Sequence, residues 1–344
     1  MSKTKKFFKI LFITASIASL WFVPWTLVKA WILPLPETVQ EQVEEGIDQG
    51  FDGMIVYVDQ AGKPPRSYAA GWHNRKAEIP AYPEALFKIA SITKLYVAVA
   101  ATRLVNEKRL SLDKTLADYF PELVGRIENA NVITLRMMVQ HRSGIPNYTD
   151  NPAFWQDSEE NRKEDLEYAL DLPADFEPGE DYGYSNTNYL LISNLIDKVV
   201  GYSHKQYIKE EILIPLGLKN TFVSLSDVPI DNVMSGYYAD LDTDFKFENT
   251  GLMLATAEDV GKFIRALNEG SVFKEGEQKI YSSIYVYEHT GLLPGYQSIA
   301  EYHKDTDTVI IQFNNSSDFE GYDWNLAEII YSRIVKIVKK NSES

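Results

Sequence analysis

Residues 91–105 read SITKLYVAVAATRLV, so that Ser91 and Lys94 stand three residues apart at the start of a long apolar run. The run from Leu95 to Val105 is apolar on nearly every side, which predicts a buried helix. Residues three apart on a helix share a face, so the lysine amine can reach the serine hydroxyl. Burial and the positive helix end lower the pKa of such a lysine, which can then take the serine proton. The pair indicates a nucleophile and its base, although Ser-x-x-Lys is equally the pattern of a capping serine beside a solvated lysine.

A second segment whose side chains could take part in catalysis is Tyr184-Ser185-Asn186. It follows the turn-rich residues 177–180 and precedes a helical pattern from Tyr189 to Val200. In an extended segment, Tyr184 and Asn186 point the same way. A tyrosine can relay a proton, and an asparagine amide can donate a hydrogen bond to a substrate carbonyl.

A third segment is His289-Thr290-Gly291, which ends the strand-like run Ile284–Glu288 and leads into Pro294-Gly295. A glycine in this place would let a ligand backbone lie close against the strand. The segment is therefore a candidate substrate-binding wall.

In this order, the three segments resemble the serine β-lactamase and penicillin-binding protein superfamily. Its S-x-x-K and K-T-G motifs correspond to Ser91–Lys94 and His289–Gly291. The Tyr-x-Asn form of the middle motif is typical of the branch with class C β-lactamases, D-Ala-D-Ala carboxypeptidases and related esterases. Residues 138–146, MVQHRSGIP, are similar to that family's His-Thr-Ser-Gly-(Leu/Ile)-Pro segment. The resemblance spans nearly all of the chain beyond residue 45.

The resemblance implies a role for each matching residue. Ser91 would be the acylated nucleophile, and Lys94 and Tyr184 would share the proton transfers. Asn186 would hold the acyl-side carbonyl of the substrate, opposite a wall made by His289, Thr290 and Gly291. The backbone N–H groups of Ser91 and Leu292 would form the oxyanion hole, which is typically worth several kcal/mol in acyl transfer.

Three positions depart from the family pattern and bear on the substrate. His289 replaces the lysine of the third motif, Leu292 stands where a small residue is usual, and Arg142 occupies a threonine position. Histidine is charged only below its own pKa, near 6.5 when unperturbed. We therefore expect low pH to strengthen recognition of a substrate carboxylate at His289. Broad β-lactam turnover is in doubt, because a bulky Leu292 would narrow the site beside the acyl carbon.

The amino-terminal region differs in charge from the rest of the chain. The 344 residues carry a formal net charge of −15, yet all charges before residue 34 are lysines, and residues 10–28 are uncharged. Such a stretch predicts one transmembrane helix with a cytoplasmic N-terminus, flanked by Trp21, Trp25 and Trp31. A cleaved signal peptide, giving a secreted or periplasmic enzyme, is the alternative. The acidic remainder makes nucleic acid an unsuitable partner.

Periodicity predicts an α/β protein of the α+β type. Residues 51–59 with 66–71, and 297–303 with 308–314, read as two hairpins, and residues 324–338 as a closing helix. We expect an antiparallel sheet flanked by helices, in a β-lactamase/transpeptidase-like fold. Residues 1–33 would form the anchor and 34–344 the hydrolase domain, with a sheet lobe at about 45–107 and 249–340 and an inserted, mostly helical lobe at about 108–248.

We interpret the sequence as a serine hydrolase that cleaves amide or ester bonds through an acyl-enzyme. A peptidase, amidase or esterase of the D-Ala-D-Ala carboxypeptidase type is favoured, acting on a small or peptide substrate that includes cell-wall-derived ones. A β-lactamase and a non-catalytic penicillin-binding-like sensor remain alternatives. No metal and no cofactor are expected, since His73, His204 and His303 are scattered and the chain has no cysteine.

Overall fold

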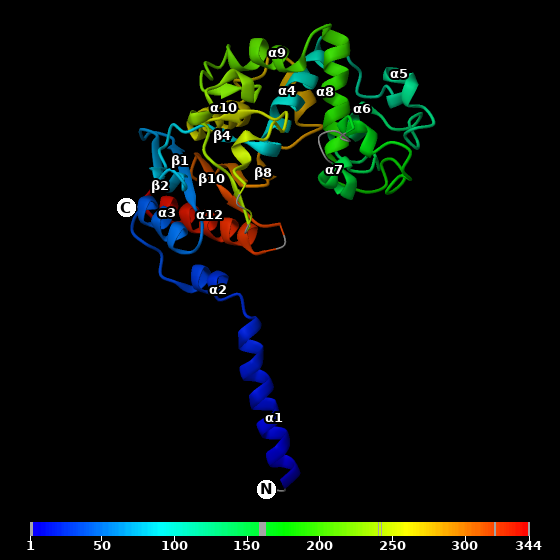
Figure 1. Ribbon diagram of the computed structural model, residues 1–344. Helices are drawn as coiled ribbons and strands as arrows, with labels where there is room; N and C mark the ends of the chain where they lie inside the picture. Colours follow the sequence, from blue (N-terminus) through cyan, green and yellow to red (C-terminus); the bar gives the residue numbers. More distant parts are fainter. Residues whose placement is uncertain (1–2, 158–162, 240, 242, 320, 343–344) are drawn as a thin grey trace.

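The computed structural model describes residues 3–157, 163–239, 241, 243–319 and 321–342. Its centre is a six-stranded antiparallel sheet (Figure 1). From one edge to the other the strands are β3 (Ile79–Pro80), β2 (Arg66–Asn74), β1 (Gly53–Gln60), β10 (Thr308–Asn314), β9 (Tyr296–His303) and β8 (His289–Leu293). Because β1 pairs with β10, both ends of the chain build the sheet, and the two predicted hairpins are confirmed.

Helices cover both faces of the sheet, and the side chains of β1 alternate between them. Met54, Val56 and Val58 belong to a core shared with α3 (Val39–Asp48) and α12 (Asp323–Lys340). Ile55 and Tyr57 belong to the core on the opposite face, under α10 (Ala257–Glu269). This two-residue period explains why β1 is buried on both sides. Truncating Ile55 to alanine would cost about 2–5 kcal/mol of stability.

Gly261 sets the distance between α10 and the sheet. A Cβ at this position would lie 2.3 Å from a ring carbon of Tyr57, which real side chains do not tolerate. The glycine therefore lets the helix approach β1 closely.

The remaining helices gather beside and above the sheet, where Figure 1 shows α4 to α9 grouped at one end. They are α4 (Thr93–Asn106), α5 (Leu116–Tyr119), α6 (Leu135–Val139), α7 (Pro152–Gln156), α8 (Asn186–Val200), α9 (His204–Ile208) and α11 (Glu277–Tyr281). Two small sheets join the parts, β4 (Phe87–Lys88) with β7 (Leu254–Ala255) and β5 (Thr221–Phe222), and β6 (Tyr237–Tyr238) with β11 (Ser316–Ser317). The lobe boundaries near residues 108 and 248 stay a prediction.

Two sequence expectations about these elements were wrong. Residues 284–288 form no strand; they turn after α11, where the Tyr281 hydroxyl donates to the Val286 carbonyl, and β8 begins only at His289. The helix expected from Tyr189 begins at Asn186, so Asn186 lies on its first turn. Ser185, which lies between Tyr184 and Asn186, has an extended backbone, with φ −139° and ψ 121°.

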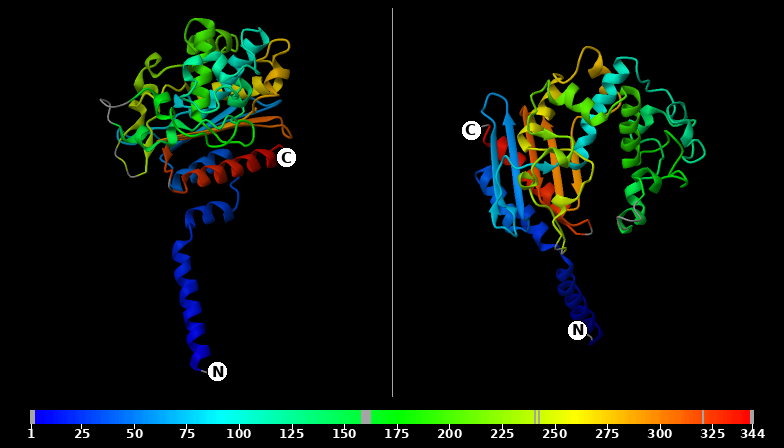
Figure 2. Two further views of the ribbon diagram at one scale, coloured as in Figure 1. Left: turned by 90° about the vertical axis from the view of Figure 1, so that its right-hand side faces the viewer. Right: turned by 45° about the horizontal axis from the view of Figure 1, so that its top comes forward.

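The amino-terminal segment is bent instead of forming the single helix expected over residues 10–28. α1 (Lys3–Ser19) continues as a short 3₁₀ turn, Leu20–Phe22, and α2 (Trp25–Ile32) follows Pro24. Within the described residues, neither helix alone has the length and apolar character to cross a bilayer; the pair passes by length and composition, with an 80° bend. Figures 1 and 2 show α1 projecting away from the domain and α2 lying beneath α12.

Candidate active site

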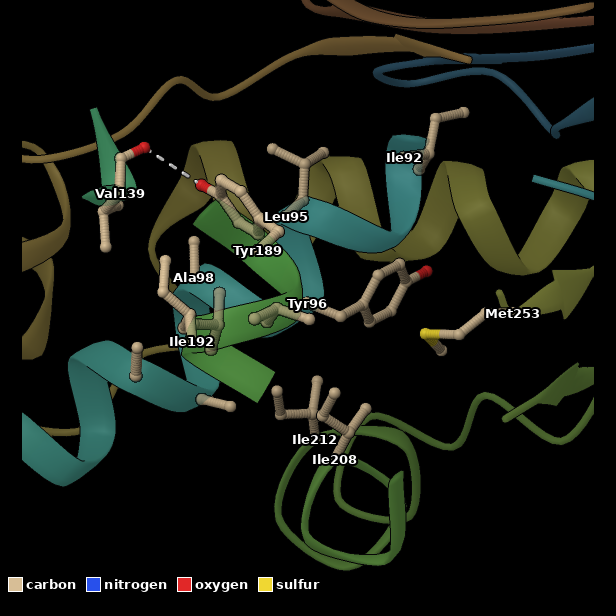
Figure 3. Packing of buried hydrophobic residues seen from close by; sticks show 14 of the residues in the cluster. Ile92, Leu95, Tyr96, Ala98, Val139, Tyr189, Ile192, Ile208, Ile212 and Met253 are labelled. Carbon is tan, nitrogen blue, oxygen red and sulfur yellow. Dashed lines mark hydrogen bonds between the residues drawn. The ribbon is translucent and has the colours of Figure 1, made fainter. Parts of the chain in front are cut away.

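Ser91 and Lys94 lie where a 3₁₀ turn, η2 (Ala90–Ile92), runs into α4. Every residue of α4 from Lys94 to Leu104 is buried, as the sequence predicts. Figure 3 shows Leu95 and Ala98 of this helix near Tyr189 and Ile192 of α8. Ala90, directly before the serine, has a φ of +51°, which non-glycine residues rarely adopt. The packed helix and this unusual turn hold Ser91 in place.

The Ser91 hydroxyl lies between two side chains. Lys94 Nζ is 3.1 Å from Ser91 Oγ, and the Tyr184 hydroxyl donates to the same oxygen at 2.8 Å. Lysine and tyrosine therefore both reach the one hydroxyl of the S-x-x-K motif. This geometry permits proton transfer from serine to lysine and from tyrosine to a leaving group.

Burial determines the protonation states of the two neighbours. Lys94 is 5% exposed, and the loss of hydration lowers the pKa of its amine to about 7. Tyr184 as a whole is 38% exposed, yet the loss of hydration around its hydroxyl raises its pKa, because the charged form is the phenolate. At neutral pH Lys94 is thus the available base, while Tyr184 keeps its proton and acts as a donor.

Asn186 connects Lys94 to the loop that carries Thr149. Its amide oxygen accepts from Lys94 Nζ at 2.7 Å, and its Nδ2 donates to Thr149 Oγ1 at 3.1 Å. An asparagine amide has two N–H donors, so one remains for a substrate carbonyl. The orientation of the amide is set by the lysine on one side and the threonine on the other.

Sequence reasoning missed the loop that carries Thr149. Asn147 Oδ1 accepts from the backbone N–H of Asn186 at 2.9 Å, and Thr187 Oγ1 accepts from Tyr148 N–H at 3.0 Å and donates to the Pro146 carbonyl at 2.6 Å. These bonds fasten residues 146–149 to the first turn of α8. The polar run Asn-Tyr-Thr directly after Pro146 was the available signal, because such residues often hydrogen-bond neighbouring backbone.

The third motif lies on β8, the edge strand, and its backbone packs against η2. A Cβ on Gly291 would lie 2.6 Å from the Ile89 carbonyl and 2.9 Å from the Ala90 Cβ. Only glycine allows this approach, which brings the strand beside Ser91. Thr290 and Leu292 are exposed on the same strand. The oxyanion-hole role of the Ser91 and Leu292 N–H groups stays a prediction.

Both ring nitrogens of His289 are engaged within the protein. Nδ1 contacts the Thr290 carbonyl, which can only accept, so Nδ1 carries the hydrogen. Nε2 lies 3.0 Å from the Tyr285 hydroxyl, which keeps its proton because burial raises its pKa. Burial also lowers the pKa of His289 to about 4. The expected gain of charge near pH 6.5 is therefore displaced below the physiological range, and at neutral pH His289 offers no cation.

His141 supports Tyr184 without touching Ser91. Its Nδ1 accepts from the backbone N–H of Ser185 at 3.1 Å, and its ring stacks on those of Tyr184 and Tyr189 at centroid distances of 4.5 and 5.2 Å. Burial lowers its pKa to about 3, so the ring is neutral. The side chain thus orients the tyrosine by packing.

The described residues contain no group of three or more His, Asp or Glu side chains placed to hold a metal ion. A family model described as "Beta-lactamase" matches residues 35–328. The chain belongs to the beta-lactamase family. Members of this family are serine hydrolases of the superfamily that also contains the D,D-peptidases.

Curated relatives in this family match at moderate identity. The N-acetylmuramyl-L-alanine amidase of Bacillus subtilis is 28% identical over 199 residues, which are 53% of this chain and 45% of that protein. The protein PbpX of Bacillus subtilis is 26% identical over 293 residues, 77% of this chain and 71% of that one. The chain spans about half the length of the first of these relatives.

Solved structures of the family share the fold. A D-amino acid amidase from Ochrobactrum anthropi superposes with a TM-score of 0.76 at 21% identity, over 88% of this chain and 98% of that one. A class C beta-lactamase from Rhodobacter sphaeroides gives 0.67 at 19% identity, over 87% of this chain and 99% of that one. The predicted β-lactamase/transpeptidase-like fold is thereby confirmed.

Proposed function

We propose that this protein hydrolyses amide or ester bonds through an acyl-enzyme on Ser91. The observation that carries the proposal is the placement of Ser91 Oγ between Lys94 Nζ and the Tyr184 hydroxyl, at 3.1 and 2.8 Å. A serine is a weak nucleophile until an adjacent base takes its proton. A lysine with a pKa of about 7 supplies that base at neutral pH.

The proposed reaction has two steps. In the first, the Ser91 proton passes to neutral Lys94, Oγ bonds to the acyl carbon, and the leaving group departs with a proton delivered through Tyr184. In the second, water gives a proton to Lys94 while its oxygen bonds to the acyl carbon. The bond between Oγ and the acyl carbon then breaks, the acid is released, and Oγ takes up a proton, so that Ser91 and neutral Lys94 are restored. Asn186 would hold the acyl carbonyl side through its free N–H, and the N–H groups of Ser91 and Leu292 would receive the oxyanion.

Within this class, the state of His289 favours substrates whose leaving group lacks a carboxylate. A third-motif lysine would supply a permanent cation, whereas this histidine is neutral and uses both nitrogens internally. We therefore favour amidase or esterase activity over carboxypeptidase activity and over β-lactam hydrolysis. The match to a Bacillus N-acetylmuramyl-L-alanine amidase makes cell-wall-derived amides reasonable candidates.

We further propose that α1 and α2 attach the enzyme to a membrane, with the catalytic domain outside the cytoplasm. The lysines at residues 3, 5, 6 and 9 precede the apolar stretch, and cytoplasmic flanks are enriched in such residues. A signal sequence is the competing proposal. Recovery of a chain that begins near residue 31 would favour it.

Intact-protein mass spectrometry tests the hydrolase proposal. We expect a fluorophosphonate to add once to the wild-type protein and to the Ser282→Ala control, which alters an exposed serine, but not to Ser91→Ala. The wild type should turn over an activated ester. A stable penicillin adduct without ester turnover would support a sensor, and rapid loss of a penicillin adduct would support a β-lactamase. Labelling of Ser91→Ala at the wild-type rate would refute the assignment.

A further inference from the structure

α2 is packed onto the catalytic domain instead of hanging free from it. Ala30 is fully buried against the core formed with α12, and Leu27 packs beside it. The linker that follows is held by Arg333 of α12, whose guanidinium donates to the carbonyls of Leu33 at 2.7 Å and Pro34 at 2.9 Å. The same buried guanidinium donates to Gln42 of α3 at 2.6 Å. The helix therefore keeps a defined orientation on the domain.

α2 is rich in exposed apolar groups. Together with the preceding turn it exposes large side chains at Trp21, Phe22, Trp25, Trp31 and Ile32. Between α2 and α12 lies a hollow of about 450 Å³, with apolar walls at Trp31, Leu33 and Leu35 and polar walls at Glu328, Arg333 and Lys336. Apolar patches of this kind mark interaction surfaces, and this one continues directly into the exposed apolar surface of α1.

The angle between the two helices suggests what covers this surface. α1 and α2 meet at 80°, so an α1 along the bilayer normal places α2 about 10° from the membrane plane. Tryptophan side chains prefer the level of the lipid headgroups, which is the depth of a helix lying in that plane. The charged residue of α2 is Lys29, an exposed cation whose stem can lie along apolar surface while its amine reaches lipid phosphates.

We propose that α2 is an interfacial helix that seats the catalytic domain against the surface of a phospholipid bilayer. This inference rests on the proposal that α1 enters the membrane, and it goes beyond attachment. A domain clamped to α2 through α12 holds its active site at one orientation and one height above the lipid, whereas a flexible tether would let it rotate and move away.

The absence of cysteine allows a direct test in the full chain. Single variants Leu11→Cys, Ile32→Cys and Ile214→Cys each take one environment-sensitive fluorophore. Ile32 and Ile214 are exposed isoleucines with matched accessibility, 64% and 65%, so Ile214→Cys is the control. Each protein is reconstituted into phosphatidylcholine vesicles with about one fifth phosphatidylglycerol, carrying a nitroxide quencher at either a shallow or a deep acyl position. A circular dichroism spectrum and a thermal unfolding transition like those of the wild type show that each labelled variant is folded.

We expect the label at Ile32 to shift to the blue and to be quenched more by the shallow nitroxide than by the deep one. The label at Leu11 should be quenched more by the deep nitroxide, and the label at Ile214 should stay aqueous and unquenched. Quenching at Leu11 with an aqueous Ile32 label would overturn the seating of α2 while leaving the anchor intact. Aqueous labels at both positions would overturn the anchor and the seating together. Ester hydrolysis reports on the catalytic proposal separately.

Discussion

Lys94 Nζ lies closer to the amide oxygen of Asn186, at 2.7 Å, than to the hydroxyl of Ser91, at 3.1 Å. A neutral amine has two N–H donors and one lone pair. When one N–H is donated to Asn186, the lone pair can be directed at the serine proton. Asn186 therefore orients the base in addition to any contact that it makes with a substrate.

Replacing Lys94 by methionine should abolish turnover and stabilise the fold. The unfolded lysine has an ordinary pKa near 10.5, whereas the folded one has a pKa of about 7, so the unfolded chain binds more protons between these values. The free energy of unfolding of the wild type therefore rises with pH across that window. Below pH 7 the wild type is less stable than Lys94→Met by the full cost of burying the charged amine. We expect the variant to gain about 2 kcal/mol at pH 6.5 and much less at pH 10. Urea unfolding of both proteins at the two pH values measures this, and an equal or lower stability of the variant at pH 6.5 would contradict it.

The pH dependence of ester hydrolysis should report Lys94. For a neutral ester, kcat/KM should rise about tenfold per pH unit below pH 7 and level off above it, as Lys94 loses its proton. His289 and His141, with pKa values lowered to about 4 and 3, do not titrate in this range, and burial keeps Tyr184 protonated. A rise centred near pH 10 would instead indicate a charged, ordinary Lys94.

Thr149 should affect turnover by orienting the side-chain amide of Asn186. Thr149→Val removes the acceptor for the Asn186 amide at nearly constant volume, and we expect about a 3- to 10-fold loss of kcat/KM, the usual effect of one hydrogen bond. Thr149→Ser keeps the hydroxyl and should retain most of the activity. Equal losses in both variants would point to a packing role, and steady-state kinetics on one activated ester distinguishes the outcomes.

Because His289 stays neutral, the pH profiles of kcat/KM for a carboxylate-bearing ester and for a neutral ester should be parallel between pH 5 and 8. His289→Lys introduces a permanent cation and should lower KM several-fold for the carboxylate ester alone. His289→Gln, which stays neutral, is the control. A wild-type preference for the carboxylate ester that grows as the pH falls from 7 to 5 would show that His289 gains charge in that range.

The sequence predicted the sheet well because its strands have clear two-residue alternation and turn residues between them. The hairpins β1–β2 and β9–β10 were predicted for this reason, as was the helix that carries Lys94, whose apolar residues leave no other interpretation. The three motifs were found because each has its own residue types in a recognisable order.

Other features depend on distance and burial, which no local pattern contains. Thr149 is 37 residues from Asn186, and nothing in either segment shows that they touch. The neutral state of His289 follows from Tyr285 and from burial, whereas the sequence shows only a histidine. The bend at Pro24 was missed for a different reason: residues 10–28 were taken together as one uncharged stretch, although a proline inside such a stretch is itself a signal for a helix break.

The pairing of β1 with β10 has a consequence for how the enzyme matures. Met54 pairs with Asn314 and Gln60 with Thr308, so the central pair of strands joins residues separated by most of the chain. Loops of that length are slow to close, and such sheets fold late. A ribosome must therefore release nearly the whole polypeptide before the sheet can form. β1 can pair early with the neighbouring β2, but its other edge stays open until β10 is available, and an open strand edge in a partly folded chain is a site of aggregation.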